Sequence, residues 1–215
     1  MPGKLLYFDL GARGELIRAL CFLKDFEFEN KLLSFEEFGA MKADPNSPLP
    51  LGSLPVWEED GMTIAQSNAI LRMLGMRTGM YSQDAKIMWE IDSLLDFMEE
   101  NWAHANSYGV ATLFKGGVFT EETEEQWKGY WTKMIPFLAG RLAKHDKKWV
   151  AGTDEMTVAD LKAYHTFVLF LEHPSNPTPE EQKEFARTKI AEHPRLAQYV
   201  RELSAAMQPW MNARS

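Results

Sequence analysis

The chain has a single cysteine, Cys21, among its 215 residues. One cysteine cannot form an internal disulfide, so the fold is expected to depend on a packed core, as in proteins of a reducing compartment. The start of the chain has no apolar segment of signal-peptide length, and no run approaches the ~18 apolar residues that a membrane span needs. These absences predict a cytoplasmic protein with no membrane partner.

The chain also has fewer basic than acidic residues. The 23 lysines and arginines stand against 31 aspartates and glutamates, which gives a net charge of −8. Nucleic acids and anionic membranes repel such a surface. The five histidines show no metal-ligand spacing, so no metal is expected. The expected partner is therefore a small molecule or another protein.

The first part of the chain alternates short strands with helices. Strand patterns occur at residues 4–8 and 28–33, and between them a helical pattern follows Gly14 and ends near Lys24. A brief helix is predicted at 35–42, followed by an irregular loop. With the hairpin and helix after that loop, the order predicts a βαβ unit joined to a ββα unit in one small mixed sheet.

From residue 82 onward the strand patterns stop and long amphipathic segments take over. Helices are predicted at 84–110, 120–145, 157–171, 180–190 and 194–207. Thr157 and Asp160 have the spacing of a capping box, and Met156 can act as the hydrophobic staple. The chain is thus predicted to hold an α/β domain over residues 1–81 and an all-helical domain over residues 84–215.

The stretch from Leu54 to Asn68 combines a hairpin with a helix start. Pro55 has no N–H to donate and can hold a cis bond, and Val56 could then pair with a short extended ligand. Ser67 is a favourable N-cap, so Gln66 and Ser67 lie where unpaired backbone N–H groups favour a carboxylate. One interpretation is a seat for a peptide-like carboxylate. The other is a hairpin that leads into an ordinary capped helix.

Tyr7 lies near the end of the first predicted strand, and Arg13 and Gly14 follow in the loop. A tyrosine hydroxyl can donate a hydrogen bond to a thiolate, which lowers the pKa of the thiol. A drop of about two units requires ~2.7 kcal/mol of differential stabilisation, which one or two charge-assisted hydrogen bonds can supply. The alternative is a core tyrosine whose hydroxyl bonds to the backbone.

Taken together, several motifs resemble those of the cytosolic glutathione transferases. The motifs are Tyr7-Phe8, residues 13–18, Leu54-Pro55-Val56, residues 66–72, and residues 149–152 leading to the box at 157–160. The resemblance covers nearly the whole chain. Among the classes, the chain is similar to the tyrosine-using sigma, pi and mu group, and the motifs do not select one of the three. It implies a thioredoxin-like domain followed by an all-helical domain, glutathione as co-substrate, a small hydrophobic electrophile as second substrate, and a homodimer.

The resemblance also implies a role for each matching residue. Tyr7 would stabilise the glutathione thiolate, and Arg13 would support the site. The residues implied to bind glutathione are Phe8, Phe38, Lys42, Ser53, Leu54, Pro55, Val56, Gln66, Ser67 and, across the dimer, Glu100 with Glu99 as the alternative. The electrophile pocket would include Leu10, Asn106, Tyr108 and Met207.

Three positions depart from the family pattern. Ser53 stands where glutamine usually precedes the Leu-Pro pair, and Phe38 stands where tryptophan is usual, so glutathione would lose side-chain hydrogen bonds. Leu51 lies where several classes have an aromatic dimer key. These departures leave two alternatives open: a non-catalytic binding, lens or scaffold protein, and a glutathione-dependent isomerase or peroxidase. Cys21, on the apolar face of its helix, is expected to be a core residue rather than a nucleophile.

Overall fold

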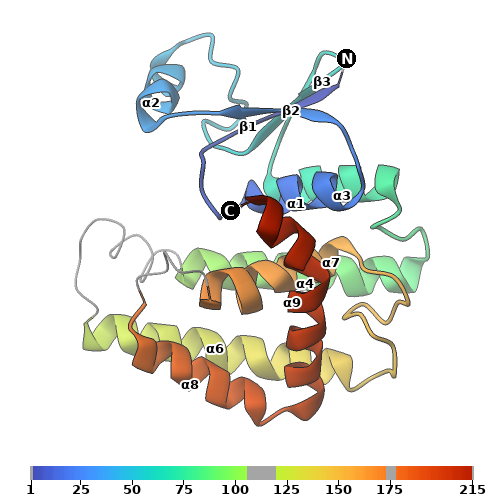
Figure 1. Cartoon of the computed structure of the whole chain (residues 1–215). Helices are drawn as coiled ribbons and strands as arrows, with labels where there is room; N and C mark the ends of the chain where they lie inside the picture. The colour runs from blue at the N-terminus through green and yellow to red at the C-terminus, as the bar shows by residue number, and fades with distance from the viewer. Residues whose placement is uncertain (1, 106–119, 173–177, 215) are drawn as a thin grey trace. The chain divides into compact units, whose positions relative to one another are not determined.

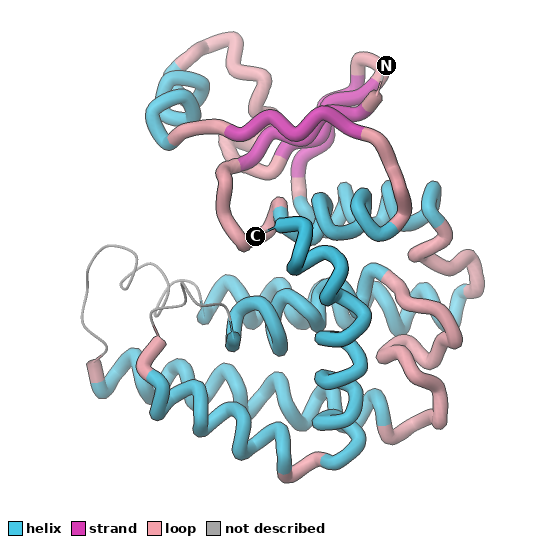
Figure 2. Tube along the Cα trace, in the orientation of Figure 1, coloured by secondary structure: helices cyan, strands magenta, loops and turns pink. Residues whose placement is uncertain are grey.

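The computed structural model describes residues 2–105, 120–172 and 178–214, without the side chains of residues 103–105. The chain forms two compact units, Met1–Tyr81 and Ser82–Ser215. In the described part of the chain the first unit holds all the strands, and the second holds only helices and loops (Figure 2). The predicted fold class, an α/β domain followed by an all-helical one, is therefore confirmed.

A four-stranded mixed sheet with the order β2-β1-β3-β4 forms the centre of the first unit. Its strands are β1 (Gly3–Tyr7), β2 (Phe28–Leu32), β3 (Val56–Glu59) and β4 (Met62–Ala65). β1 runs parallel to β2 and antiparallel to β3, and β3 is antiparallel to β4. The parallel pair needs a crossover, which α1 (Glu15–Leu23) supplies.

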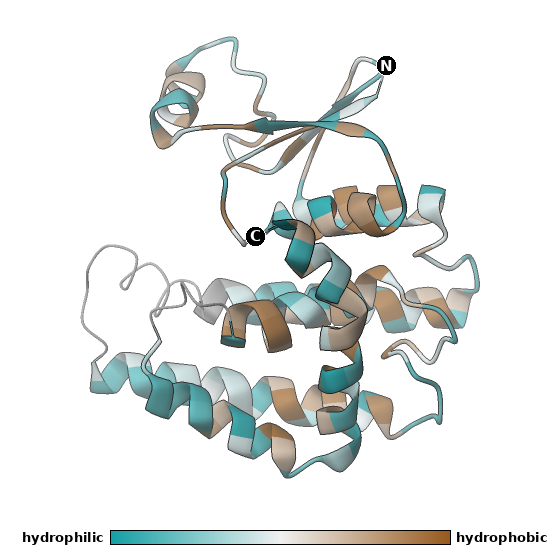
Figure 3. Ribbon diagram, in the orientation of Figure 1, coloured by the Kyte–Doolittle hydropathy of each residue, from teal (hydrophilic) through white to brown (hydrophobic). Residues whose placement is uncertain are grey.

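Two helices of the first unit, α1 and α3 (Ser67–Thr78), pack against each other on one face of the sheet (Figure 1). Their inward residues recur at helical spacing, so each helix has a continuous apolar stripe. Leu16 and Leu20 of α1 and Ile70 and Leu74 of α3 are almost completely buried. Figure 3 shows this apolar character as brown bands on both helices.

The remaining helix of the first unit, α2 (Phe35–Ala43), has no buried residue. Its start is fixed locally, because Ser34 accepts a hydrogen bond from the Glu37 N–H while the Glu37 carboxylate accepts one from the Ser34 N–H. This reciprocal capping box satisfies two otherwise unpaired donors. The brief helix predicted at 35–42 is confirmed.

The second unit is a bundle of helices. Its described α-helices are α4 (Ala85–Ala105), α6 (Glu121–Leu142), α7 (Val158–Tyr164), α8 (Glu180–Ala191) and α9 (Pro194–Arg214). α6 packs against α4, α8 and α9, and α7 packs against α4 and α9. Among the described helices, none combines the length and the apolar content that a membrane crossing needs.

The predicted capping box at residues 157–160 is present at the start of α7. The fully buried carboxylate of Asp160 accepts hydrogen bonds from the Thr157 N–H (2.8 Å), the Val150 N–H (3.0 Å) and the Tyr199 hydroxyl (2.8 Å). Burial raises the pKa of Asp160, and these hydrogen bonds oppose the rise. One side chain thus joins three segments of the second unit.

Two helix predictions in this unit were wrong in detail. The helix predicted at 157–171 is α-helical only to Tyr164 and continues as a π-helix, η2 (His165–Phe170). The last helix does not end at Met207 but runs to Arg214, with Pro209 inside it. Trp210 is buried beyond the proline, and packing of this kind offsets the proline's cost to the helix.

Candidate functional site

Three strands of the first unit meet in one row of the sheet. Val56, the first residue of β3, lies opposite Leu6 in β1 and opposite Ala65 in β4. β3 is therefore an interior strand, and an extended ligand cannot add along its edge. Any pairing of a ligand with β3 is confined to the end where Val56 begins the strand.

The residues next to this row lie at the same end of the sheet. Tyr7 follows the row on β1, Pro55 precedes it on β3, and Gln66 follows it on β4. The Leu54–Pro55 bond is cis, as expected. The strand register therefore places the Tyr7 residue, the start of β3 and the start of α3 at one end of the sheet of the first unit.

At this end of the sheet, the Tyr7 ring is buried and fixed by its neighbours. Its side chain is 6% exposed, and the Arg18 guanidinium lies 5.7 Å from the centroid of its ring. Gly14 lies against the other part of the ring, because a Cβ at that position would come within 2.3 Å of the Tyr7 Cδ1 atom. The position therefore has room only for glycine.

Burial raises the pKa of the Tyr7 hydroxyl, while the Arg13 charge and the backbone N–H groups of Arg13 and Gly14 act to lower it. Burial prevails because the charged phenolate loses more solvation than these groups restore. The hydroxyl is therefore protonated at neutral pH. It can donate a hydrogen bond to an anion, which is the property expected from the sequence.

Arg18 is a site residue to which the sequence analysis gave no role. Its buried guanidinium donates to the carbonyl oxygens of Phe8 (2.7 Å) and Leu10 (3.4 Å) and pairs with Glu15 at 3.3 Å. These bonds fix the loop between β1 and α1, which carries Arg13. The available signal was the charged pair at i, i+3 in an otherwise apolar helix.

The start of α3 differs by one residue from the prediction. Gln66, rather than Ser67, occupies the N-cap position, and its carbonyl accepts the first helical hydrogen bond from Ile70. Gln66 has φ 75° and ψ 110°, a conformation that costs about 1–3 kcal/mol and is often found at ligand clamps. Ser67 is the first helical residue. The residue is 5% exposed, and its hydroxyl makes no hydrogen bond within the described residues.

The loop and α2 supply the other predicted residues of this unit. A hydrophobic cluster at the sheet consists of Leu6, Leu33, Leu49 and Val56, and Phe38 and Leu54 pack against it. Ser53 is exposed. The Phe38 ring also contacts Phe8 edge-on at 5.3 Å, and the Lys42 ammonium lies 5.5 Å from the Phe38 ring centroid. Phe38 thus has a packing role that needs no indole N–H.

The two neighbouring carboxylates on α4, Glu99 and Glu100, lie in different environments. Glu99 forms an ion pair with Lys162, whose side chain is almost completely buried. Glu100 is exposed. Of the two carboxylates considered for contact with glutathione across a dimer, Glu100 is therefore the one with an exposed side chain.

The residues predicted for the electrophile pocket come from both units of the chain. Leu10 is 37% exposed in the first unit, and Met207 is fully buried on α9 in the second. Asn106 and Tyr108 lie outside the described residues. This pocket stays a prediction.

Cys21 is a core residue, as expected. It is almost completely buried on α1, and burial raises the pKa of its thiol to about 12. A thiol with such a pKa is a poor nucleophile at neutral pH. In the described part of the chain, no group of three or more histidine, cysteine, aspartate and glutamate residues could hold a metal ion.

Comparisons with known proteins converge on one family. Residues 1–75 match the family model of the glutathione S-transferase N-terminal domain, and residues 110–202 match that of the C-terminal domain. The chain is 31% identical over 159 residues to glutathione S-transferase 1 of Ascaris suum, which covers 74% of this chain and 75% of that protein. It is 26% identical over 207 residues to S-crystallin SL11 of Nototodarus sloanii, with 94% and 97% coverage.

The fold also recurs in solved structures. The crystal structure of monomeric Na-GST-3, a glutathione S-transferase from the hookworm Necator americanus, superposes on this chain with a TM-score of 0.79. The match covers 100% of this chain and 98% of that chain at 23% identity. At that identity the likeness concerns the fold alone.

Proposed function

Because the chain belongs to the cytosolic glutathione S-transferase family, we propose that it is an enzyme that joins the glutathione thiolate to small hydrophobic electrophiles. The family uses glutathione as its co-substrate and is typically cytoplasmic and dimeric. The observation that carries the proposal is the common end of the sheet at which Tyr7, Pro55 and Gln66 lie.

In this proposal Tyr7 supplies the chemical step. Its hydroxyl keeps its proton at neutral pH and donates a hydrogen bond to the sulfur of glutathione, which favours the thiolate over the thiol. Arg13 adds positive charge beside the hydroxyl, and Arg18 fixes the loop that carries Arg13. The thiolate then attacks the electrophilic carbon and forms a C–S bond, and in a substitution such as that on a chloronitrobenzene the C–Cl bond breaks and chloride leaves with the electron pair.

The start of α3 would bind the γ-glutamyl end of glutathione. The first turn offers backbone N–H groups without helical partners, and the Ser67 hydroxyl is available to donate. Val56 would pair with the cysteinyl backbone, and Lys42, exposed in the last turn of α2, would meet the glycyl carboxylate. Phe8, Phe38 and Leu54 would form the apolar side of this seat, and Ser53 would contribute at its edge.

The substitution Tyr7→Phe tests the catalytic role. It keeps the ring in its place and removes only the hydroxyl, so retention on immobilised glutathione should survive while turnover at neutral pH falls. The pKa of the bound thiol, followed by thiolate absorbance, should rise by about two units. Tyr81→Phe, at another buried tyrosine of the same unit, is the matched control and should leave that pKa unchanged. An unchanged thiol pKa in Tyr7→Phe would refute the role.

A non-catalytic binding or lens protein is the second candidate. The similarity to an S-crystallin favours it, as does the absence of glutamine and tryptophan side chains at Ser53 and Phe38. Retention on glutathione resin followed by an assay with a chloronitrobenzene separates the two. Retention with turnover supports the enzyme, retention without turnover supports binding or a narrower isomerase or peroxidase reaction, and no retention argues against both.

A homodimer is part of the proposal. Glu100 is the exposed carboxylate that would reach the glutathione amine of the partner subunit. Na-GST-3, which has the same fold, is monomeric in its solved structure, so the fold alone does not decide the assembly. Sedimentation at micromolar concentration tests the point. A fully active monomer would remove the role of Glu100.

A further inference from the structure

A cavity of about 560 Å³ lies in the second unit where the loop after α6 meets the start of α9. Its volume falls in the range of small-ligand pockets, about 300–1,000 Å³. None of the residues assigned to glutathione or to the electrophile lines it. We call it the polar cavity, because its lining includes His145, Asp146, Lys148, Arg195 and Glu202.

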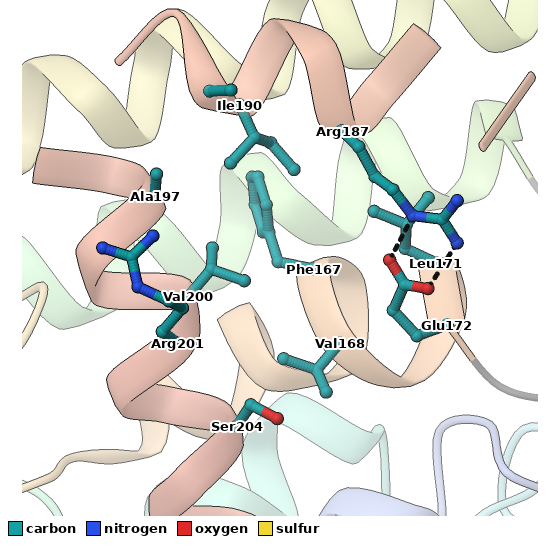
Figure 4. Close-up of a pocket in the computed structure, with 11 residues that line it drawn as sticks. Phe167, Val168, Leu171, Glu172, Arg187, Ile190, Ala197, Val200, Arg201 and Ser204 are labelled. Carbon is teal, nitrogen blue, oxygen red and sulfur yellow. Dashed lines mark hydrogen bonds and ion pairs between the residues drawn. The ribbon is translucent and has the colours of Figure 1, made fainter. Parts of the chain in front are cut away.

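α9 also lines another cavity, which Figure 4 shows, but with different residues. Ala197 and Val200 contribute to that lining. The charge of Arg187 there is already balanced, because its guanidinium donates to both Glu172 oxygens, at 2.9 and 2.6 Å. The polar cavity differs, because two of its charged groups lack such a partner.

The positive charge of the polar cavity belongs to Arg195. Its Nη2 donates to the carbonyl oxygens of Lys147 (2.6 Å) and Lys148 (3.1 Å), which fix the guanidinium at the loop. Its Nη1 is buried and has no hydrogen-bond partner within the described residues. The same holds for both ring nitrogens of His145 in that loop. This part of the lining therefore has donors that lack an acceptor.

A carboxylate on the same side of α9 has the opposite need. The Glu202 Oε1 atom accepts a hydrogen bond from Gln198 at 2.8 Å, while its Oε2 atom is buried without a partner in the described part of the chain. Arg195 and Glu202 differ by seven positions, which is two helical turns and a rise of about 10 Å. Each is held by a different neighbour, and among the described residues no ion pair joins them.

These unpaired atoms define what a ligand must supply. Buried polar atoms without partners are unfavourable, so a ligand that pairs with them gains affinity. The last torsions of histidine and glutamate are broad, so His145 and Glu202 can turn toward the cavity at little cost. An anion alone would leave Glu202 unpaired, and a cation alone would leave Arg195 unpaired. Charge-assisted hydrogen bonds are stronger than neutral ones, which favours a doubly charged ligand over a neutral polyol.

We propose that the polar cavity binds a small zwitterion of the amino-carboxylate class, with its two charges several methylenes apart. The carboxylate meets Arg195 and His145, and the ammonium meets Glu202. The separation of two helical turns favours a long spacer over an α-amino acid. Asp146 and Lys148, the other charged residues of the lining, have opposite signs and together favour neither an anion nor a cation.

Titration of the isotope-labelled full chain with ε-aminocaproate, followed by amide chemical shifts, tests the proposal. Caproate and hexylamine have a chain of the same length but only one charge each. The zwitterion should bind about three- to fivefold more tightly than either, because each loses one ion pair. Glycine should bind more weakly, since it cannot reach both charges. The shifts should cluster at residues 145–148 and 195–202, with or without S-hexylglutathione.

Three variants assign the two charges. Glu202→Gln keeps an acceptor for Gln198 and removes the negative charge, so ε-aminocaproate should then bind no better than caproate. Arg195→Gln removes the positive charge, so the zwitterion should bind no better than hexylamine. Arg201→Gln is the matched control, because Arg201 is exposed on α9 and lines only the cavity of Figure 4. It should leave all three affinities unchanged.

The thermal midpoint of each variant shows whether it folds, and Glu202→Gln remains decisive if Arg195→Gln loses its contacts with the loop. Absence of shifts at tens of millimolar would mean that water alone satisfies these atoms, and would overturn the proposal. Equal affinities for the three probes, displacement of ε-aminocaproate by S-hexylglutathione, or an unchanged preference for the zwitterion in Glu202→Gln would each overturn it as well.

Discussion

The contact between Gly14 and the Tyr7 ring gives the sharpest prediction. A Cβ on residue 14 would lie 2.3 Å from Cδ1 and 2.5 Å from Cγ of Tyr7. Carbon atoms prefer separations of about 3.5–4.0 Å, so one group must move by more than ~1 Å. Tyr7 ends a strand paired on both sides, and Arg18 lies over its ring, so the ring has little freedom.

Gly14→Ala should therefore lower the free energy of unfolding by about 2–3 kcal/mol, the upper range for overpacking. Backbone strain plays no part, because Gly14 has φ −72°, which alanine adopts freely. Gly140→Ala is the matched control. No atom lies within 4 Å of its added Cβ, and alanine in a helix interior should raise stability by about 0.5–1 kcal/mol.

Urea denaturation of both variants measures these changes, and a double-mutant cycle isolates the contact. In a Tyr7→Ala background the ring is gone and only the Cβ of residue 7 stays close, at 3.0 Å, so most of the penalty of Gly14→Ala should disappear. A Gly14→Ala protein as stable as the unaltered chain would refute the reasoning. A penalty of the same size without the ring would refute it equally.

Three further predictions concern the strained clamp, the thiol and the buried tyrosines. Gln66→Gly should keep or slightly raise the free energy of unfolding, because relief of about 1–3 kcal/mol of strain offsets the ~0.5–1 kcal/mol entropy cost of glycine. The affinity for glutathione, measured by calorimetry, should fall. A loss of more than ~1 kcal/mol in the free energy of unfolding would contradict the presence of strain at Gln66. Cys21, with a pKa of about 12, should resist iodoacetamide at pH 8 until urea unfolds the chain, and stoichiometric labelling of the native protein would disprove its burial. Burial raises the pKa of Tyr7, Tyr130 and Tyr199. Above pH ~10 the tyrosines of the unfolded chain release protons that those of the folded chain keep, so the free energy of unfolding should fall as pH rises through and above that value. Tyrosinate absorbance and helical circular dichroism should therefore change together. Full titration of the tyrosines near pH ~10 with intact helices would contradict this prediction.

The order of elements was predictable from the sequence because it depends on local signals. Short apolar runs, turn residues and helical spacing identified each strand of the first unit and the change to helices at residue 82. Proline chemistry allowed a cis bond before Pro55, and the family resemblance implied it. The box at Thr157 and Asp160 followed from a fixed spacing.

The remaining features depend on tertiary packing, which local signals alone do not specify. Serine is a better N-cap than glutamine, so the sequence favoured Ser67, but the strand row holds Gln66 in a conformation that starts the helix one residue earlier. Pro209 looks like a stop signal, yet α9 continues past it to the buried Trp210. The role of Arg18 required knowing which carbonyl oxygens the loop turns toward it.

Because α2 has no buried residue, the rate at which it opens locally is expected to differ from that of the sheet. A helix with so little packing can open locally while the sheet stays closed, so its amides should exchange with deuterium far sooner than those of β1. Lys42 lies in its last turn. A ligand held by Lys42 would have to keep the helix closed, and exchange in α2 would slow in proportion to ligand occupancy.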